Sequence, residues 1–117
     1  MRSISIEIGG KQREFSFGIR ALGNVLQEFD NDIIKYLELL ENNGFLAAPP
    51  TLYHLHAHAL NRSGKEVDFT VNDVEDWLEE KEGMFHNKDV QRVMSEFIKT
   101  LTGYVPKQEQ QKPSKKK

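Results

Sequence analysis

The chain contains no cysteine, and no apolar run approaches the roughly 18 residues needed to span a membrane. The lack of cysteine excludes disulfide bonds, thiolate zinc sites and cysteine nucleophiles, and it suits a reducing compartment. The N-terminal sequence MRSISIEI lacks the apolar core and cleavage site of a signal peptide. We therefore expect a cytoplasmic protein with no membrane partner.

The patterns of common enzyme and cofactor sites are also missing. Gly9-Gly10-Lys11 does not have the glycine spacing of a phosphate-binding loop, and no Gly-x-Ser-x-Gly elbow is present. The acidic segment DFTVNDVEDWLEE lacks the central glycine of a calcium loop, and its carboxylates are expected to face water. We expect no catalytic residues, no cofactor and no enzymatic activity.

Positive charge is scarce in most of the chain. Residues 1–106 carry 11 Lys and Arg against 17 Asp and Glu, whereas residues 107–117 carry five Lys and one Glu. An acidic body repels a phosphate backbone, so we expect no nucleic-acid partner. Residues 104–117 are polar and broken by proline, which predicts a flexible basic tail after a single domain over residues 1–103.

The segment ISIEIGGKQREFSF predicts a two-stranded β-hairpin. Isoleucine alternates with polar residues, which is the period of a half-buried strand. Gly9-Gly10 supplies the positive φ angles of a two-residue turn. Because two strands alone are marginal in water, the apolar face of the hairpin must dock on helices. The expected strand pairs are Ile8 with Lys11, Ile6 with Arg13, and Ile4 with Phe15.

About five short helices are predicted behind the hairpin, so the fold class is α+β and mainly α. The first helix covers about residues 19–29. The second helix is capped at its start by Asp30-Asn31-Asp32 and ends at Asn42-Asn43-Gly44. A capping box at residues 70–73 begins the fourth helix, and Asn87 caps the last one, which Gly103 ends.

The third helix is predicted over residues 52–61. The segment HLHAHA alternates strictly and also fits a strand, but alanine is a strong helix former and a poor strand former. Pro49-Pro50 is expected to block any helix running through from upstream, so Thr51 becomes the N-cap. Residues 45–48, with the sequence FLAA, then become a loop.

His54 and His58 lie one helical turn apart and suggest a zinc site. A catalytic zinc needs three protein ligands, however, and His56 points roughly away from the other two. His86 lies in a distant loop. We therefore expect a polar, solvated helix face and no metal ion.

Four apolar side chains are candidates for binding a protein partner. Phe45 and Leu46 lie in the expected loop without a helical stripe to bury them, and exposed apolar patches often mark partner sites. Tyr53 lies on the helix that follows. Trp77 has helical spacing with neighbouring apolar residues, so we expect it to anchor the core, with an interface role as the alternative.

The opening ISIEIGGKQREFSFGIRALGNVLQEF and the helix DIIKYLELLE resemble the tail assembly chaperones of long-tailed (siphovirus-type) bacteriophages. In many members, a hairpin with Gly-Lys at its turn and Phe-Gly at its end leads into a helix with an Ala-Leu pattern. The later segment FTVNDVEDWLEE is similar to another helix start of that family. The order and spacing of these motifs over about residues 3–101 carry the resemblance.

The resemblance implies a non-enzymatic assembly factor of the host cytoplasm that is absent from the mature virion. It implies two partners, the tape measure protein, which is kept soluble, and the tail tube protein, which is recruited; self-association stays open. The alternative is a small helical protein-binding adaptor or regulator of bacterial or prophage origin. A long helical tape measure gene immediately downstream would distinguish the first function from the second.

Overall fold

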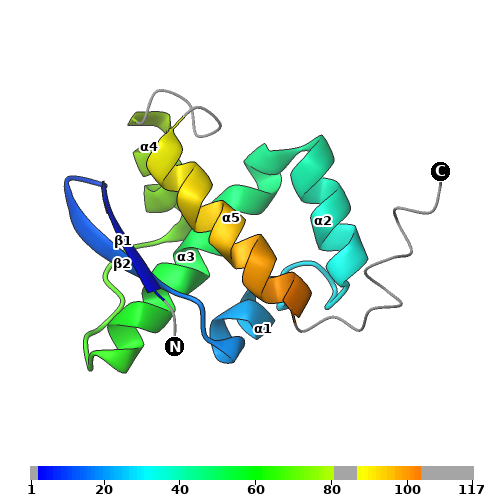
Figure 1. Cartoon of the computed structure of the whole chain (residues 1–117). Helices are drawn as coiled ribbons and strands as arrows, with labels where there is room; N and C mark the ends of the chain where they lie inside the picture. Colours follow the sequence, from blue (N-terminus) through cyan, green and yellow to red (C-terminus); the bar gives the residue numbers. More distant parts are fainter. Residues whose placement is uncertain (1–2, 81–86, 104–117) are drawn as a thin grey trace.

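The computed structural model describes residues 3–80 and 87–103, apart from the side chain of Phe45. In this part of the chain a two-stranded antiparallel hairpin is followed by five helices (Figure 1). The predicted α+β, mainly helical fold is confirmed. The predicted tail at residues 104–117 lies outside the described residues.

The hairpin consists of β1 (Ser3–Ile8) and β2 (Lys11–Ser16). Its register is the predicted one, from Ile8 opposite Lys11 to Ile4 opposite Phe15. Gly9 and Gly10 have φ angles of 66° and 87°, the left-handed pair that a tight two-residue turn requires. Alternation therefore turns Phe15 and Arg13 of β2 toward the protein interior.

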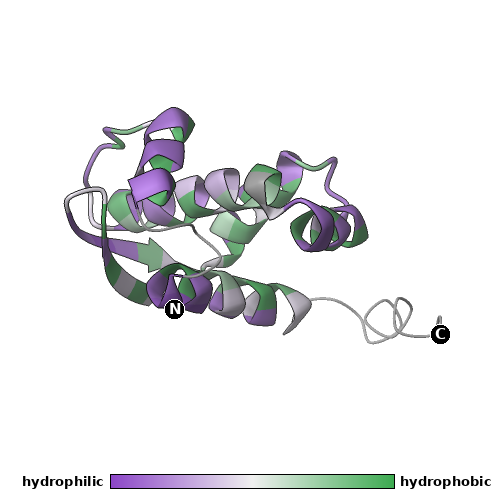
Figure 2. Ribbon diagram, turned by 90° about the horizontal axis from the view of Figure 1, so that it is seen from above, coloured by the Kyte–Doolittle hydropathy of each residue, from purple (hydrophilic) through white to green (hydrophobic). Residues whose placement is uncertain are grey.

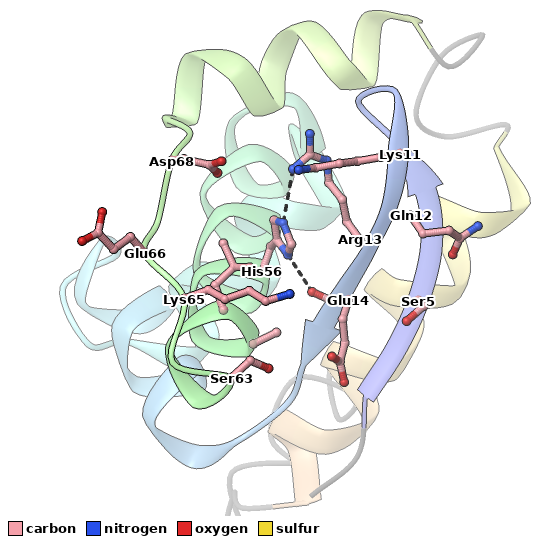
Figure 3. Close-up of a pocket in the computed structure, with 12 residues that line it drawn as sticks. Ser5, Lys11, Gln12, Arg13, Glu14, His56, Ser63, Lys65, Glu66 and Asp68 are labelled. Atoms are coloured by element: carbon pink, nitrogen blue, oxygen red, sulfur yellow. Dashed lines mark hydrogen bonds between the residues drawn. The ribbon is translucent and has the colours of Figure 1, made fainter.

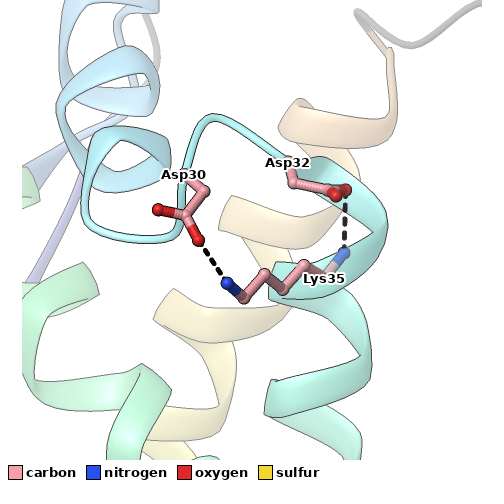
Figure 4. A network of polar contacts seen from close by, with 3 residues as sticks. All are labelled: Asp30, Asp32 and Lys35. Atoms are coloured by element: carbon pink, nitrogen blue, oxygen red, sulfur yellow. Dashed lines mark hydrogen bonds and ion pairs between the residues drawn. The ribbon is translucent and has the colours of Figure 1, made fainter.

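Helix α1 (Ile19–Gln27) ends two residues before its predicted end. The backbone reverses at Asp30 and Asn31, which have φ angles of 61° and 58°, and Asn31 donates its N–H to the Leu26 carbonyl at 2.8 Å. Helix α2 (Ile33–Asn42) begins as predicted, because the Asp32 carboxylate accepts the Lys35 N–H at 3.0 Å. The Lys35 ammonium also pairs with Asp30 across the turn (Figure 4).

Helix α3 spans Gly44–Arg62, and two predictions about its N-terminal part are wrong. Residues 45–48 form its first turn and not a loop, and Pro49 and Pro50 lie inside the helix. Both prolines lie near the N-terminus of α3, so the backbone hydrogen bonds that they remove involve only carbonyls of the first turn. Little of the helix precedes them, which limits the clash of their rings with preceding carbonyls. Burial of Ala47 and Ala48 in the core opposes that loss.

Thr51 is consequently an interior residue of α3 and not its N-cap. Its hydroxyl donates to the Ala47 carbonyl at 2.7 Å and shares a second 2.7 Å hydrogen bond with the Tyr36 hydroxyl of α2. Burial raises the pKa of Tyr36 to about 12. This buried contact stabilises the early start of α3, and it joins residues 15 positions apart.

Helix α4 (Val71–Glu80) begins with the predicted capping box. The Asp73 N–H donates to the Thr70 hydroxyl at 3.2 Å, and the Thr70 N–H donates to the Asp73 carboxylate at 2.8 Å. Helix α5 (Lys88–Gly103) is capped as predicted by Asn87, whose side-chain oxygen accepts the Val90 N–H at 3.0 Å. The segment between the two helices, residues 81–86, lies outside the described residues.

Helix α3 lies at the centre of the fold, in contact with β2, α1, α2 and α4, while α5 packs along β1 (Figure 1). Most helices are amphipathic and turn their apolar side inward (Figure 2). Tyr36 and Phe97 meet edge to face in the core, with ring centroids 5.6 Å apart. No helix within residues 3–80 and 87–103 is long and apolar enough to cross a membrane.

Candidate functional site

The first candidate site is built around Arg13, a charged residue that is only 9% exposed. The register of β2 points it inward, where its Nε donates to the Ile8 carbonyl at 2.8 Å and Nη2 donates to the Gly9 carbonyl at 3.1 Å. Its Cζ lies 3.9 Å from the centroid of the Trp77 ring. Desolvation lowers the pKa of Arg13, opposed by the charges of Asp68 and Asp73. Arg13 thus ties the hairpin turn to α4.

His56 of α3 is 4% exposed and completes this buried cluster. Its Nδ1 lies 2.7 Å from the Glu14 carbonyl, which can only accept, so Nδ1 carries the proton. Nε2 then accepts from Arg13 Nη1 at 3.4 Å (Figure 3). Burial lowers the pKa of His56, and the Arg13 charge lowers it further, against the opposing effect of the bond to Glu14.

A polar cavity of about 440 Å³ opens beside His56 (Figure 3). Lys11 and Lys65 bring positive charge to its wall, and Glu66 and Asp68 bring negative charge. Both ring nitrogens of His56 already have partners, so the imidazole is not free to take a proton from a substrate. The cluster is therefore suited to holding the hairpin, α3 and α4 together.

The three histidines of α3 do not converge on one point. His54 pairs with Glu28, the C-cap residue of α1, at 2.9 Å, whereas His56 faces β2. Within residues 3–80 and 87–103, no group of three or more His, Cys, Asp or Glu side chains is placed to hold a metal ion. The prediction of a solvated face is wrong for His56, because docking of β2 and α4 on α3 buries that ring. His86 lies outside the described residues.

The predicted protein-binding residues fall in two separate places. Tyr53 and Trp77 are half-buried and both contact Phe69, with ring centroids 5.1 Å and 5.3 Å from it. Leu46 lies in the first turn of α3 and is 58% exposed. The side chain of Phe45 lies outside the described residues. Partner binding by these four residues stays a prediction.

A second candidate site is an apolar groove of about 200 Å³ beside α5. Met94 and Ile98 are half-buried on α5, and Leu40 from the end of α2 faces them with Ala48 of α3. The remaining lining residues are Val90, Gln91 and Ser95. Because the groove is open and mostly apolar, it suits an apolar side chain of a second polypeptide.

Sequence reasoning missed this groove, although a signal was present. The apolar stripe of α5 is wide: Val93 and Phe97 are buried in the core, whereas Met94 and Ile98 are left half-exposed. An apolar stripe that is wider than the core it covers leaves part of its apolar surface exposed.

Comparisons with protein-family models, curated proteins and solved structures find no match for this chain.

We expect the free energy of unfolding to fall as the pH is lowered from 7.5 to 5.5. Burial lowers the pKa of both His56 and His58 in the folded chain. The unfolded chain then binds protons first, so this stability is intact above pH about 6.5 and declines as the pH falls toward the folded pKa values. Urea unfolding at several pH values measures the decline.

His56→Gln is the matched variant for that experiment, because glutamine keeps polar atoms but does not titrate. It should be less stable than the parent at pH 7.5 and lose less stability between pH 7.5 and 5.5. An identical pH dependence in the two proteins would contradict the assignment to His56.

Proposed function

We propose that this protein is a non-enzymatic tail assembly chaperone of a long-tailed phage. It binds the helical tape measure protein in the host cytoplasm, keeps it soluble and helps to recruit tail tube subunits. The groove formed by Met94, Ile98 and Leu40 is the single observation that carries the proposal. The family resemblance of the sequence supplies the identity of the client.

The groove has the features needed to hold a helical client. An amphipathic helix binds by laying apolar side chains, spaced three or four residues apart, into an apolar channel. Met94 and Ile98 are themselves four residues apart, so they present a continuous strip along α5. Gln91 and Ser95 add polar groups to its lining, which limits nonspecific association.

The acidic surface supports the same function. On α4, Glu75, Asp76, Glu79 and Glu80 are exposed, while Val74 and Leu78 face the core. Repulsion between such surfaces keeps chaperone–client complexes apart in solution. Glu82 lies outside the described residues.

Co-expression with the tape measure protein tests the proposal. The tape measure protein should stay soluble and co-purify with this chain, and should aggregate without it. Unchanged solubility together with no co-purification would contradict the proposal. Co-purification of the chain with an unrelated protein, and never with a tape measure protein, would favour the adaptor alternative.

Met94→Lys should weaken client binding by roughly thirtyfold, since loss of a central apolar contact costs about 2 kcal/mol. Asn24→Lys is the matched control, because Asn24 is exposed on α1 and does not line the groove. Both variants add one positive charge. Pull-down yield and the melting temperature are measured for each; equal loss of binding in both variants, with both folded, would exclude the groove as the site.

A further inference from the structure

A basic pocket of about 410 Å³ lies where the first turn of α1 meets the last turn of α3. Among the described residues, none lines both this pocket and either the apolar groove or the polar cavity beside His56. The inference drawn from it is therefore independent of the proposed chaperone function. Its lining residues are Gly18, Ile19, Arg20, His58, Asn61 and Arg62.

The charge of this pocket is opposite to that of the rest of the body. Arg20 and Arg62 are exposed, and within the described part of the chain neither forms an ion pair. The pKa of His58 is lowered by burial and then by the positive charges of Arg62 and Arg20. The described lining of the pocket includes no carboxylate, so the two arginines make it a site of positive potential.

The pocket has two further polar features, the ring of His58 and the N-terminus of α1. The Nε2 atom of His58 is buried and makes no hydrogen bond within the described part of the chain. Gly18 is the N-cap of α1 and has no side chain, so the N-cap residue itself makes no side-chain hydrogen bond to the first N–H groups of this nine-residue helix. A buried polar atom without a partner costs free energy, and an uncapped helix N-terminus attracts negative charge.

Ile19 narrows the choice of ligand. It is 68% exposed, and it lines the same pocket as the two arginines. A free inorganic anion would leave this apolar surface in water, whereas a peptide can cover it with an apolar side chain. The arginines and the helix N-terminus suit the carboxylate of an acidic residue, and the adjacent apolar surface suits an apolar residue next to it in the same peptide.

We propose that this pocket binds a carboxylate of a partner polypeptide through Arg20, Arg62 and the N-terminus of α1, with Ile19 packing against an apolar side chain next to that carboxylate. The bound carboxylate takes the place that an N-cap side chain would occupy at α1. It also draws a proton onto Nε2 of His58, which gives that atom a hydrogen-bond partner.

The test is an NMR titration of the isotope-labelled full chain with four probes: acetyl-Leu-Glu-amide, acetyl-Leu-Gln-amide, acetate and inorganic phosphate. The glutamate dipeptide should shift the amide signals of Ile19, Arg20 and Ala21 and raise the pKa of His58. It should bind at least tenfold more tightly than the glutamine dipeptide and more tightly than acetate. Equal binding of the two dipeptides, or shifts confined to other regions, would overturn the proposal.

Three variants separate the sources of affinity. Arg20→Gln with Arg62→Gln should abolish the shifts, whereas Arg92→Gln on α5 should leave them unchanged. Ile19→Ser should remove the advantage of the glutamate dipeptide over acetate. Saturation by phosphate at lower concentration than by the glutamate dipeptide, unaffected by Ile19→Ser, would show a simple anion site and overturn the peptide assignment.

Discussion

Gly9→Ala is expected to lower the free energy of unfolding by about 3 kcal/mol. The φ angle of Gly9 is +66°, a region that a residue with a Cβ enters at a cost. A Cβ built at this position would also lie 2.6 Å from Cε2 of Trp77, well inside contact distance. The turn must therefore shift from α4, which disturbs the contact of Arg13 with the indole ring. Urea unfolding measures the loss.

Gly10→Ala is the matched control for that change. Gly10 also has a positive φ angle, +87°, but within residues 3–80 and 87–103 no heavy atom apart from Gly10 and its two chain neighbours lies within 4 Å of the added Cβ. It should lose only the backbone contribution, about 1–2 kcal/mol. The difference between the two variants measures the close approach to Trp77. Equal destabilisation of both would show that the hairpin tip does not press against that ring.

Trp77→Ala is expected to destabilise the fold by about 3 kcal/mol. The indole ring packs against Phe69 and lies under the Arg13 guanidinium, 3.9 Å from its Cζ. Truncation removes both contacts and leaves the buried cation without its aromatic partner. Because Trp77 is half-buried, the loss should fall near the lower end of values for large aromatic residues.

Trp77→Phe should retain part of this stability, since a smaller ring still offers an aromatic face to Arg13. Thermal and urea unfolding of the two variants give the comparison. If Trp77→Ala melts at the parent temperature and loses only partner binding, Trp77 belongs to an interface and not to the core.

Local chemistry explains why much of the fold was predictable. The hairpin register follows from Gly9-Gly10 and the alternation around it, because a two-residue turn sets every pair. Three helix starts use the same local contact, in which a side-chain oxygen accepts a hydrogen bond from the backbone N–H three residues later. The accepting residues are Asp32, Thr70 and Asn87. Such contacts depend on neighbouring residues alone and can be read from the sequence.

The early start of α3 could not be read in the same way. Pro49 and Pro50 carry a strong local signal against a helix, and the opposing contributions are long-range. The long-range contributions that favour the helix are the hydrogen bond between Thr51 and Tyr36 and the burial of Ala47 in the core. Tertiary packing outweighed local propensity here.

The candidate sites show the same division between local and long-range information. The inward direction of Arg13 follows from strand alternation, but its contacts with His56 and Trp77 join β2 to α3 and α4. The groove forms because the end of α2 leaves the strip of Met94 and Ile98 on α5 partly uncovered. The sequence of α5 alone does not show how much of that strip α2 covers. Both require the assembled fold.

The most direct test of the proposed client binding is a map of the bound tape measure protein on this chain. A helical tape measure fragment that co-purifies with the protein is titrated into the isotope-labelled chain and followed by NMR. We predict that the largest shifts lie at Leu40, Ala48 and along α5 from Gln91 to Ile98, and that Met94→Lys removes them. Binding that leaves these signals unchanged, or no binding of any tape measure fragment, would contradict the account.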